Sequence, residues 1–195
     1  MFSENNLLLE NIKFSQNPFP HFSSDKILDE KLAHQLLNWF KITDHWHFTQ
    51  TSFYTQYEFS LLDLDVPVEL RQLSASEFIQ GLKIFFKDQF NTGELKLVGI
   101  TAHKLVDGYR MGVHNDFIGK DETHRLIVQL NDNWTEDNGG FLMLFNSKDP
   151  HDVAKIIKPV HNSGIGFEIS TKSYHAVSTV HSFERYTLVY TFSSF

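Results

Sequence analysis

The sequence contains no cysteine among its 195 residues. Without thiols the chain can form no disulfide, no thiolate zinc site, no iron–sulfur cluster and no cysteine nucleophile. Long apolar runs are also lacking, and no segment approaches the roughly 20 apolar residues of a membrane-spanning helix. Residues 1–6 have neither the basic start nor the apolar run of a signal peptide. We therefore expect a cytoplasmic protein that is not associated with a membrane.

Basic residues are in the minority. There are 17 Lys and Arg against 24 Asp and Glu, which gives a formal net charge of -7 and argues against nucleic acid as a partner. The 5 prolines are scattered, and we find no repeat, low-complexity tract or linker. We expect a single domain over residues 1–195, with 1–17 as a short extension.

Two helices are predicted in the first half of the chain. Asp29 is a candidate N-cap for a helix whose apolar positions form one face: Leu32, Leu36, Leu37 and Phe40. The segment 74–77 has the capping-box pattern and precedes a second amphipathic run that contains Phe78, Leu82, Phe85 and Phe86. Residues 91–93 are a plausible end of that helix.

After Gly93 the hydrophobic period changes to that of β-strands. Strands are predicted for 125–131, 141–145, 165–169 and 186–192, with turns at 139–140 and 161–164. Helices followed by many short strands indicate an α+β fold whose main body is an antiparallel sandwich or jelly roll.

His114-Asn115-Asp116 is the single His-x-Asp or His-x-Glu of the chain. On a strand, positions i and i+2 point to the same side, so both side chains could reach one metal ion. With 24 acidic residues and 11 histidines, about one such pair is expected by chance, so a pair of surface residues is the competing interpretation.

Two further residues favour the metal interpretation. His175 can supply a third ligand, and two imidazoles with one carboxylate form the facial triad of non-haem Fe(II) oxygenases. Arg185 begins an otherwise apolar strand, and a buried arginine requires an anion. If Arg185 points inward, Thr187 does so too.

These residues form an ordered set that resembles a known family. The set comprises His114-x-Asp116, the segment 125–131 (RLIVQLN), Trp134, the segment 139–145 (GGFLMLF), His175 and Arg185. It is similar to the 2-oxoglutarate- and Fe(II)-dependent oxygenases, and most of all to their prolyl 4-hydroxylase-like branch. The resemblance extends over about residues 18–192 and includes the opening segment 18–22 (PFPHF).

The resemblance implies a fold, a reaction and a set of cofactors. The fold would be a double-stranded β-helix (jelly roll) with N-terminal helices packed on the major sheet. Fe(II) would bind His114, Asp116 and His175, and 2-oxoglutarate would chelate the iron while its 5-carboxylate pairs with Arg185. The reaction would consume O2, hydroxylate an unactivated C–H bond and form succinate and CO2. Ascorbate is a candidate reductant.

Other contacts to the co-substrate follow from the same resemblance. Gln129 stands where prolyl hydroxylases carry a tyrosine that helps to hold the 5-carboxylate. Arg125, four residues earlier on the same face, and Thr187 are further candidates for this pocket.

Substrate contacts are expected from three segments, 51–58, 107–112 and 117–122. The candidate residues are Tyr54, Tyr57, Tyr109 and Arg110. They are compatible with a small-molecule or a peptidyl substrate. The departure at Gln129 favours a small molecule or an amino-acid side chain over peptidyl proline.

Two other functions remain open from the sequence. A non-catalytic jelly-roll binding or sensing protein would have no need for an inward arginine. A zinc hydrolase with the same His2Asp ligands would lack an obvious general base and would leave Arg185 unexplained. The remaining histidines, among them His45, His47, His103, His124 and His161, are interpreted as surface or core residues.

Overall fold

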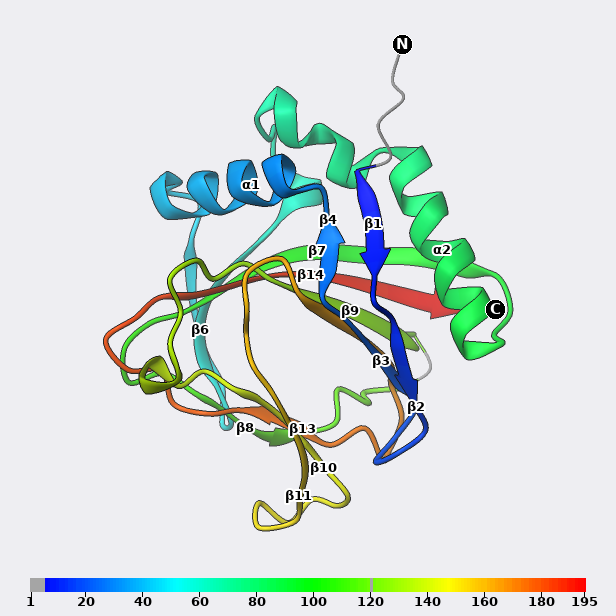
Figure 1. Ribbon diagram of the computed structural model, residues 1–195, viewed down its shortest axis with the longest axis vertical. Helices are drawn as coiled ribbons and strands as arrows, with labels where there is room; N and C mark the ends of the chain where they lie inside the picture. The colour runs from blue at the N-terminus through cyan, green and yellow to red at the C-terminus, as the bar shows by residue number, and fades with distance from the viewer. Residues whose placement is uncertain (1–5, 120) are drawn as a thin grey trace.

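Two antiparallel β-sheets face each other and enclose the interior of the molecule (Figure 1). A computed structural model describes residues 6–119 and 121–195. The larger sheet contains, in spatial order, β2 (Lys13–Ser15), β3 (His21–Ser24), β12 (Gly164–Glu168), β9 (His124–Gln129), β14 (Arg185–Ser194), β7 (Leu95–Leu105), β6 (Thr55–Ser60) and β5 (His47–Gln50). The smaller sheet contains β11 (Val153–Ile157), β10 (Leu142–Phe145), β13 (His175–Val177) and β8 (Met111–His114).

From β7 onward the chain crosses repeatedly between the two sheets. Strands β7, β9, β12 and β14 lie in the larger sheet, and β8, β10, β11 and β13 lie in the smaller one. This alternation is the double-stranded β-helix that the sequence predicts. The expected turn at 139–140 is not a hairpin, because β9 and β10, the strands on either side of it, belong to different sheets. Both glycines nevertheless have positive φ angles, 61° and 67°.

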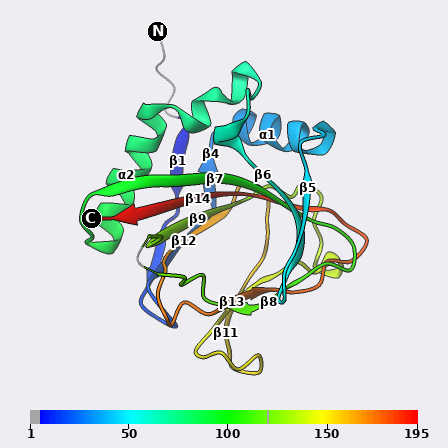
Figure 2. The same ribbon diagram turned by 180° about the vertical axis from the view of Figure 1, so that it is seen from behind.

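The helices α1 (Glu30–Ile42) and α2 (Ser76–Phe90) cover the outer face of the larger sheet (Figures 1 and 2). Asp29 caps α1 as predicted, because its carboxylate accepts hydrogen bonds from the backbone N–H groups of Lys31 and Leu32. All four predicted apolar positions of α1 are buried. The helical turns η1 (Leu61–Asp63), η2 (Val68–Ser74) and η3 (Glu136–Asn138) complete the helical structure of the described residues.

The predicted capping box of α2 is wrong. Ser74 is the last residue of η2, and its hydroxyl donates to the carbonyl of Arg71, so it is not available to cap the next helix. Helix α2 begins after Ala75, without a side-chain cap. It ends as expected near 91–93, with Asn91 in the left-handed conformation at φ 49°.

Two hydrophobic cores flank the larger sheet. The first packs the helices against the outer face of the sheet and includes Leu36, Phe40, Leu82, Phe86, Leu126, Val128 and Tyr190. The second lies between the two sheets and includes Ile127, Leu142, Leu144, Ile165, Val177 and Val189. Alternate residues of the central strands therefore pack into opposite cores. Polar side chains that point between the two sheets can form a site there.

The N-terminal segment is integrated with the sheets from residue 7 onward. Strand β1 (Leu7–Glu10) pairs with β4 (Lys26–Leu28), and β2 pairs with β3 at the edge of the larger sheet. Residues 1–5 of the expected extension 1–17 lie outside the described residues. None of the helices in the described part of the chain has the length and apolar composition of a membrane span.

Candidate active site

The structure brings together His114, Asp116 and His175. One ligand atom from each residue lies within 4.8 Å of the other two. Asp116 Oδ1 lies 3.3 Å from His114 Nε2, and Asp116 Oδ2 lies 3.3 Å from His175 Nε2. The histidines come from neighbouring strands, since His114 on β8 stands opposite His175 on β13. This arrangement can hold one metal ion on one side of its coordination sphere.

Asp116 reaches the site through a turn. Strand β8 ends at His114, and Asp116 adopts a left-handed conformation with φ 59°. The expected alternation of side chains along a strand therefore does not explain the pairing, although the two residues do converge. Aspartate tolerates this conformation better than most residues do, because its short polar side chain can bond locally.

Both imidazoles are oriented by backbone carbonyls. His114 Nδ1 lies 2.8 Å from the carbonyl oxygen of Gly112, and His175 Nδ1 lies 2.8 Å from that of Ser173. A carbonyl partner makes Nδ1 the protonated nitrogen and leaves the Nε2 lone pair for a metal. The buried hydroxyl of Ser173 also donates to the carbonyl of Asn115 at 2.7 Å, which ties the two ligand segments together. No spacing in the sequence indicated this role for Ser173.

The carboxylate of Asp116 is held in its charged form. Burial alone would raise its pKa, but the Arg125 guanidinium and the two imidazoles lower the pKa well below its usual range. Its Oδ2 atom is buried and receives no hydrogen bond of good geometry from the described residues. A buried carboxylate whose two oxygens each face the Nε2 atom of one imidazole fits a divalent cation.

Arg125 lies beside Asp116, at the end of the interior that contains the candidate metal ligands. Its Nη1 atom is 2.6 Å from Asp116 Oδ2, and its Nη2 atom is 2.6 Å from Glu122 Oε2. The expected inward direction of the side chain is correct. With both carboxylates so close, however, Arg125 is placed to position Asp116 and not to bind the far carboxylate of a co-substrate.

Arg185 is a buried cation without a carboxylate partner among the described residues. Its side chain is 4% exposed, and burial lowers its pKa to about 10, so it stays charged at neutral pH. Nε donates to the carbonyl of Gly140 at 2.9 Å, and Nη2 donates to Gln129 Oε1 at 3.0 Å. Gln129 Nε2 is buried and has no hydrogen-bond partner. Arg185 and Gln129 thus offer free N–H donors to an anion.

The strand register places both arginines on the interior face of the larger sheet. Arg185 pairs with Leu105, which belongs to the core between the sheets. Along β14, Thr187 and Thr191 share the face of Arg185, and Thr191 pairs with Arg125 on β9. The interior of the jelly roll therefore contains a candidate metal centre beside Arg125 and a candidate anion anchor at Arg185.

Comparison with known proteins shows which family has a similar set of residues. Residues 100–192 match the 2OG-Fe(II) oxygenase superfamily, and this segment contains every candidate metal and anion ligand described so far. Over this segment the chain is similar to the 2OG-Fe(II) oxygenases. Proteins of that family use Fe(II), 2-oxoglutarate and O2, and the His114, Asp116 and His175 cluster fits such an iron site. No curated protein matches the chain in sequence.

Several solved structures share the fold of this chain. A prolyl 4-hydroxylase from Pseudomonas putida is 15% identical with a TM-score of 0.73, and the match covers 90% of this chain and 92% of that one. A prolyl hydroxylase from Trichoplax adhaerens, solved with a peptide of hypoxia inducible factor, is 14% identical with a TM-score of 0.74 and covers 89% and 83%. The viral collagen prolyl hydroxylase of Paramecium Bursaria Chlorella virus-1, solved with 2-oxoglutarate, is 14% identical with a TM-score of 0.66 and covers 90% and 96%. The predicted jelly roll with N-terminal helices is thereby confirmed.

His103 is an interior residue that the sequence did not single out. It pairs with Thr187 on β14 and with Glu58 on β6, and it therefore lies in the row that also contains Gln129. Burial lowers its pKa to about 4, and the charges of Glu58, Arg125, Asp116 and Arg185 all act on it. The neutral imidazole at this position is near enough to feel the charges of both Asp116 and Arg185. One feature of the sequence could have pointed to His103: it follows Ala102, which is buried under the helices, so by alternation His103 faces the opposite side of the strand.

The predicted substrate contacts fall on different faces. Tyr54 forms a bridge with Met111 beside the metal-binding segment, and the charges of Glu58 and Asp116, together with burial, raise its pKa. Tyr57 pairs with Lys104 and shares the face of Phe59, which packs under the helices. The ring of Tyr57 stacks on that of Tyr109, with centroids 6.1 Å apart.

Phe53, which was not named individually among the candidate substrate contacts, lies beside the site. The ring of Phe53 is centred 5.0 Å from that of His114, and Phe53 is partly exposed. Arg110 is exposed, and Phe117, in the predicted segment 117–122, is exposed as well. Residue 120 of that segment lies outside the described residues.

Proposed function

We propose that this oxygenase hydroxylates an unactivated C–H bond of a small molecule or an amino-acid side chain and releases succinate and CO2. The observation that carries the proposal is Arg185. This buried guanidinium has no carboxylate partner among residues 6–119 and 121–195, and it faces the same interior as the His114, Asp116 and His175 cluster. A dicarboxylate can satisfy both ends of this interior. A non-catalytic jelly roll or a zinc hydrolase leaves the cation unexplained.

His114, Asp116 and His175 would hold Fe(II) through two Nε2 atoms and one carboxylate oxygen. Arg185 would bind the 5-carboxylate of 2-oxoglutarate, with Gln129 Nε2 as a second donor and Thr187 beside it. Bound Fe(II) and 2-oxoglutarate supply the oxidation: one atom of O2 enters the substrate hydroxyl group, and the other enters succinate as CO2 leaves.

The residues of the chain orient the reactants and exclude water. Gly112 and Ser173 fix the two imidazoles through their carbonyls, and Arg125 keeps Asp116 ionised. Tyr54, Phe53 and Arg110 would contact the substrate at the rim. The apolar ring of Phe53 beside His114 suits a substrate that has an apolar part. The Trichoplax enzyme, solved with a peptide, supports an amino-acid side chain as one such substrate.

A visible spectrum tests the metal and co-substrate assignments. We expect Fe(II) and 2-oxoglutarate, added anaerobically to tag-free protein, to produce a charge-transfer band. His175→Ala should abolish the band, whereas His151→Ala, which changes an exposed histidine in a turn, should preserve it. Absence of the band from the wild-type protein, together with absence of succinate in air, would overturn the proposal.

A substrate panel tests the reaction. Free amino acids, short proline-containing peptides and small carboxylates are scored for succinate release above the level without substrate. Each active compound is then analysed by mass spectrometry for the gain of one oxygen atom. Hydroxylation of a proline-containing peptide with no turnover of any smaller compound would show that the preference for small substrates is wrong.

A further inference from the structure

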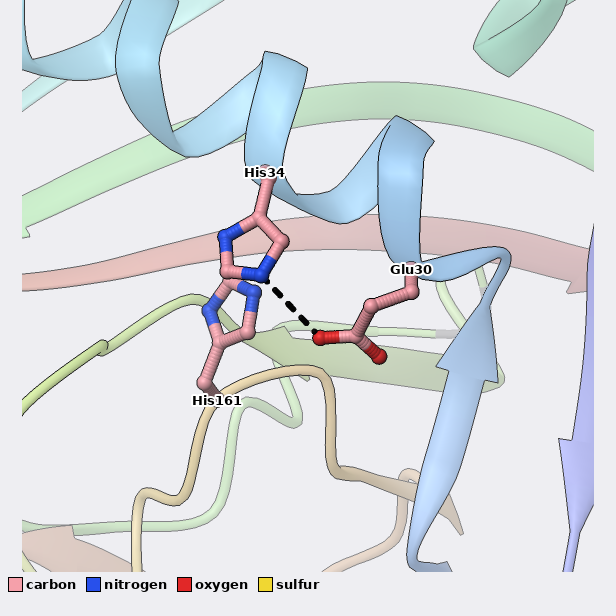
Figure 3. Close-up of side chains that lie close together, drawn as sticks. All are labelled: Glu30, His34 and His161. Carbon is pink, nitrogen blue, oxygen red and sulfur yellow. Dashed lines mark ion pairs between the residues drawn. The ribbon is translucent and has the colours of Figure 1, made fainter.

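A second cluster of metal-ligating side chains lies on the outside of the fold, away from the interior between the sheets. Glu30 and His34 occupy positions i and i+4 on α1, and His161 lies in the turn before β12. One ligand atom of each lies within 4.8 Å of the other two. Figure 3 shows the three side chains pointing toward one another, two from the helix and one from the turn. His161 follows His34 by 127 residues (161 − 34), so the sequence gives no indication of the cluster.

The imidazole of His161 lacks hydrogen-bond partners. Both of its ring nitrogens are buried, and neither has a partner among the described residues. Buried polar atoms are nearly always satisfied by protein, water or a ligand. The ring of His34 stacks against it, with centroids 4.6 Å apart, and His34 Nε2 lies 3.2 Å from Glu30 Oε1. The His161 ring therefore meets His34 through its face, and one of its nitrogens lies within 4.8 Å of ligand atoms of Glu30 and His34.

The backbone around the cluster is already fixed. Asn162, next to His161, accepts from the N–H of Leu28 at 2.9 Å and donates to the carbonyl of Leu28 at 2.7 Å. This pair of bonds holds the turn against the segment that leads into α1. The backbone of Asn162 also donates to the carbonyl of Gln129 on β9 at 2.7 Å. The three ligands are thus presented by elements whose relative position is set independently of any metal.

The surrounding charges permit a cation. Lys26 lies 3.4 Å from Glu30 Oε2, which leaves Oε1 facing the histidines. Lys41 is neutralised by Asp132 at 2.8 Å. Glu30 and His34 side chains are each 51% exposed, so they can rotate to converge on an ion, and water can complete the coordination. Two imidazoles and one carboxylate are ligands that Zn²⁺ and neighbouring late transition metals accept in tetrahedral geometry.

We propose that Glu30, His34 and His161 form a zinc-class metal site that joins α1 to the turn before β12. The ion cross-links the helix layer to the strand pair β9 and β12, and its role is structural. Because the site lies outside the interior between the sheets, it is independent of the oxygenase centre and of the function proposed for it.

Zinc titration of the full-length, tag-free protein tests the proposal. The interior cluster is first disabled with His175→Ala, so that its metal binding does not obscure the result. We expect isothermal titration of this variant with Zn²⁺ to show one site. Adding His161→Ala should remove that site, and adding His151→Ala should retain it. No zinc binding by the His175→Ala protein, or equal binding after His161→Ala, would overturn the proposal.

Thermal unfolding gives a second readout. At free zinc of 100 times the dissociation constant, the melting temperature of the His175→Ala protein should rise by about 5–10 °C. His34→Ala should abolish the rise even if His161→Ala proves poorly folded. In the otherwise unaltered chain, His161→Ala should leave Fe(II)-dependent turnover of 2-oxoglutarate unchanged, so that failure of this site and failure of the oxygenase assignment are distinguishable. A rise that persists in His34→Ala would show that the zinc binds elsewhere.

Discussion

Arg125 and Asp116 form an ion pair in which Nη1 and Oδ2 are 2.6 Å apart. The guanidinium is the largest influence that keeps the pKa of Asp116 low against the effect of burial. It also contacts Glu122, so it is fixed from two sides. Arg125 is therefore a positioning residue for the candidate metal ligand.

Replacing Arg125 with glutamine should weaken the metal site and spare the co-substrate. We expect the dissociation constant for Fe(II) to rise about 10–100-fold, the usual cost of losing a partner that orients a metal ligand. The pH below which Fe(II) affinity is lost should rise, because Asp116 no longer has the guanidinium that lowers its pKa. Arg125→Lys should restore part of the affinity. An increase in the KM for 2-oxoglutarate without any change in metal affinity would contradict this assignment.

The sequence predicted the identity of the candidate metal ligands better than their geometry. His114 and Asp116 are neighbours in the chain, and the family resemblance pointed to His175. The stated reason, alternation along a strand, was wrong because β8 ends at His114 and Asp116 has a positive φ. Whether a strand ends two residues earlier or later depends on long-range pairing, which local sequence does not determine.

Alternation did predict the faces of the central strands. Arg125 and Gln129 both point to the interior, and His124 points away, to the rings of Phe86 and Phe90. What each interior side chain contacts could not be predicted. The pairing of Arg125 with Asp116 depends on the turn after β8, and the contact of Glu30 with His161 depends on the packing of α1 against a distant turn.

Removing Arg185 should abolish tight binding of 2-oxoglutarate and spare the metal. Truncating one member of a buried charge pair costs several kcal/mol, so Arg185→Ala should weaken 2-oxoglutarate about 100-fold or more. Arg185→Lys keeps the charge but loses the planar fork, and it should give an intermediate affinity. Arg71→Ala, at an exposed arginine of η2, is the matched control. Unchanged co-substrate affinity in Arg185→Ala would exclude this residue as the anchor; Fe(II) affinity is measured in parallel.

Gly140 should be required for the position of Arg185. A Cβ atom at residue 140 would lie 2.9 Å from Arg185 Cδ, and the residue has φ 67°. We expect Gly140→Ala to weaken 2-oxoglutarate about tenfold through displacement of the guanidinium, since about 1.4 kcal/mol suffices for that factor. Gly108→Ala is the control, because Gly108 has φ 80° but no atom within 4 Å of the added methyl group. Equal losses of 2-oxoglutarate affinity in Gly140→Ala and Gly108→Ala would show that backbone strain alone causes the loss, and not displacement of Arg185.

His124 should make the fold sensitive to acid. Burial lowers its pKa from 6.5 to about 4, so the unfolded state binds the proton first as the pH falls. Its contribution is present above about pH 6.5 and is lost progressively down to about pH 4, by about 3 kcal/mol in total. Other buried histidines add to the acid sensitivity, and a comparison with one substitution isolates His124.

His124→Phe replaces the imidazole with a ring that does not titrate and can pack against Phe86 and Phe90. Between pH 7 and pH 5, the free energy of unfolding of the wild-type protein should fall by about 2 kcal/mol more than that of this variant. Urea denaturation at both pH values measures the difference, and His151→Ala at an exposed position should follow the wild type. If the free energy of unfolding fell equally in His124→Phe and in the wild type, His124 would not remain neutral in the folded protein. The two proteins differ in their pH dependence only if folding prevents His124 from taking up a proton.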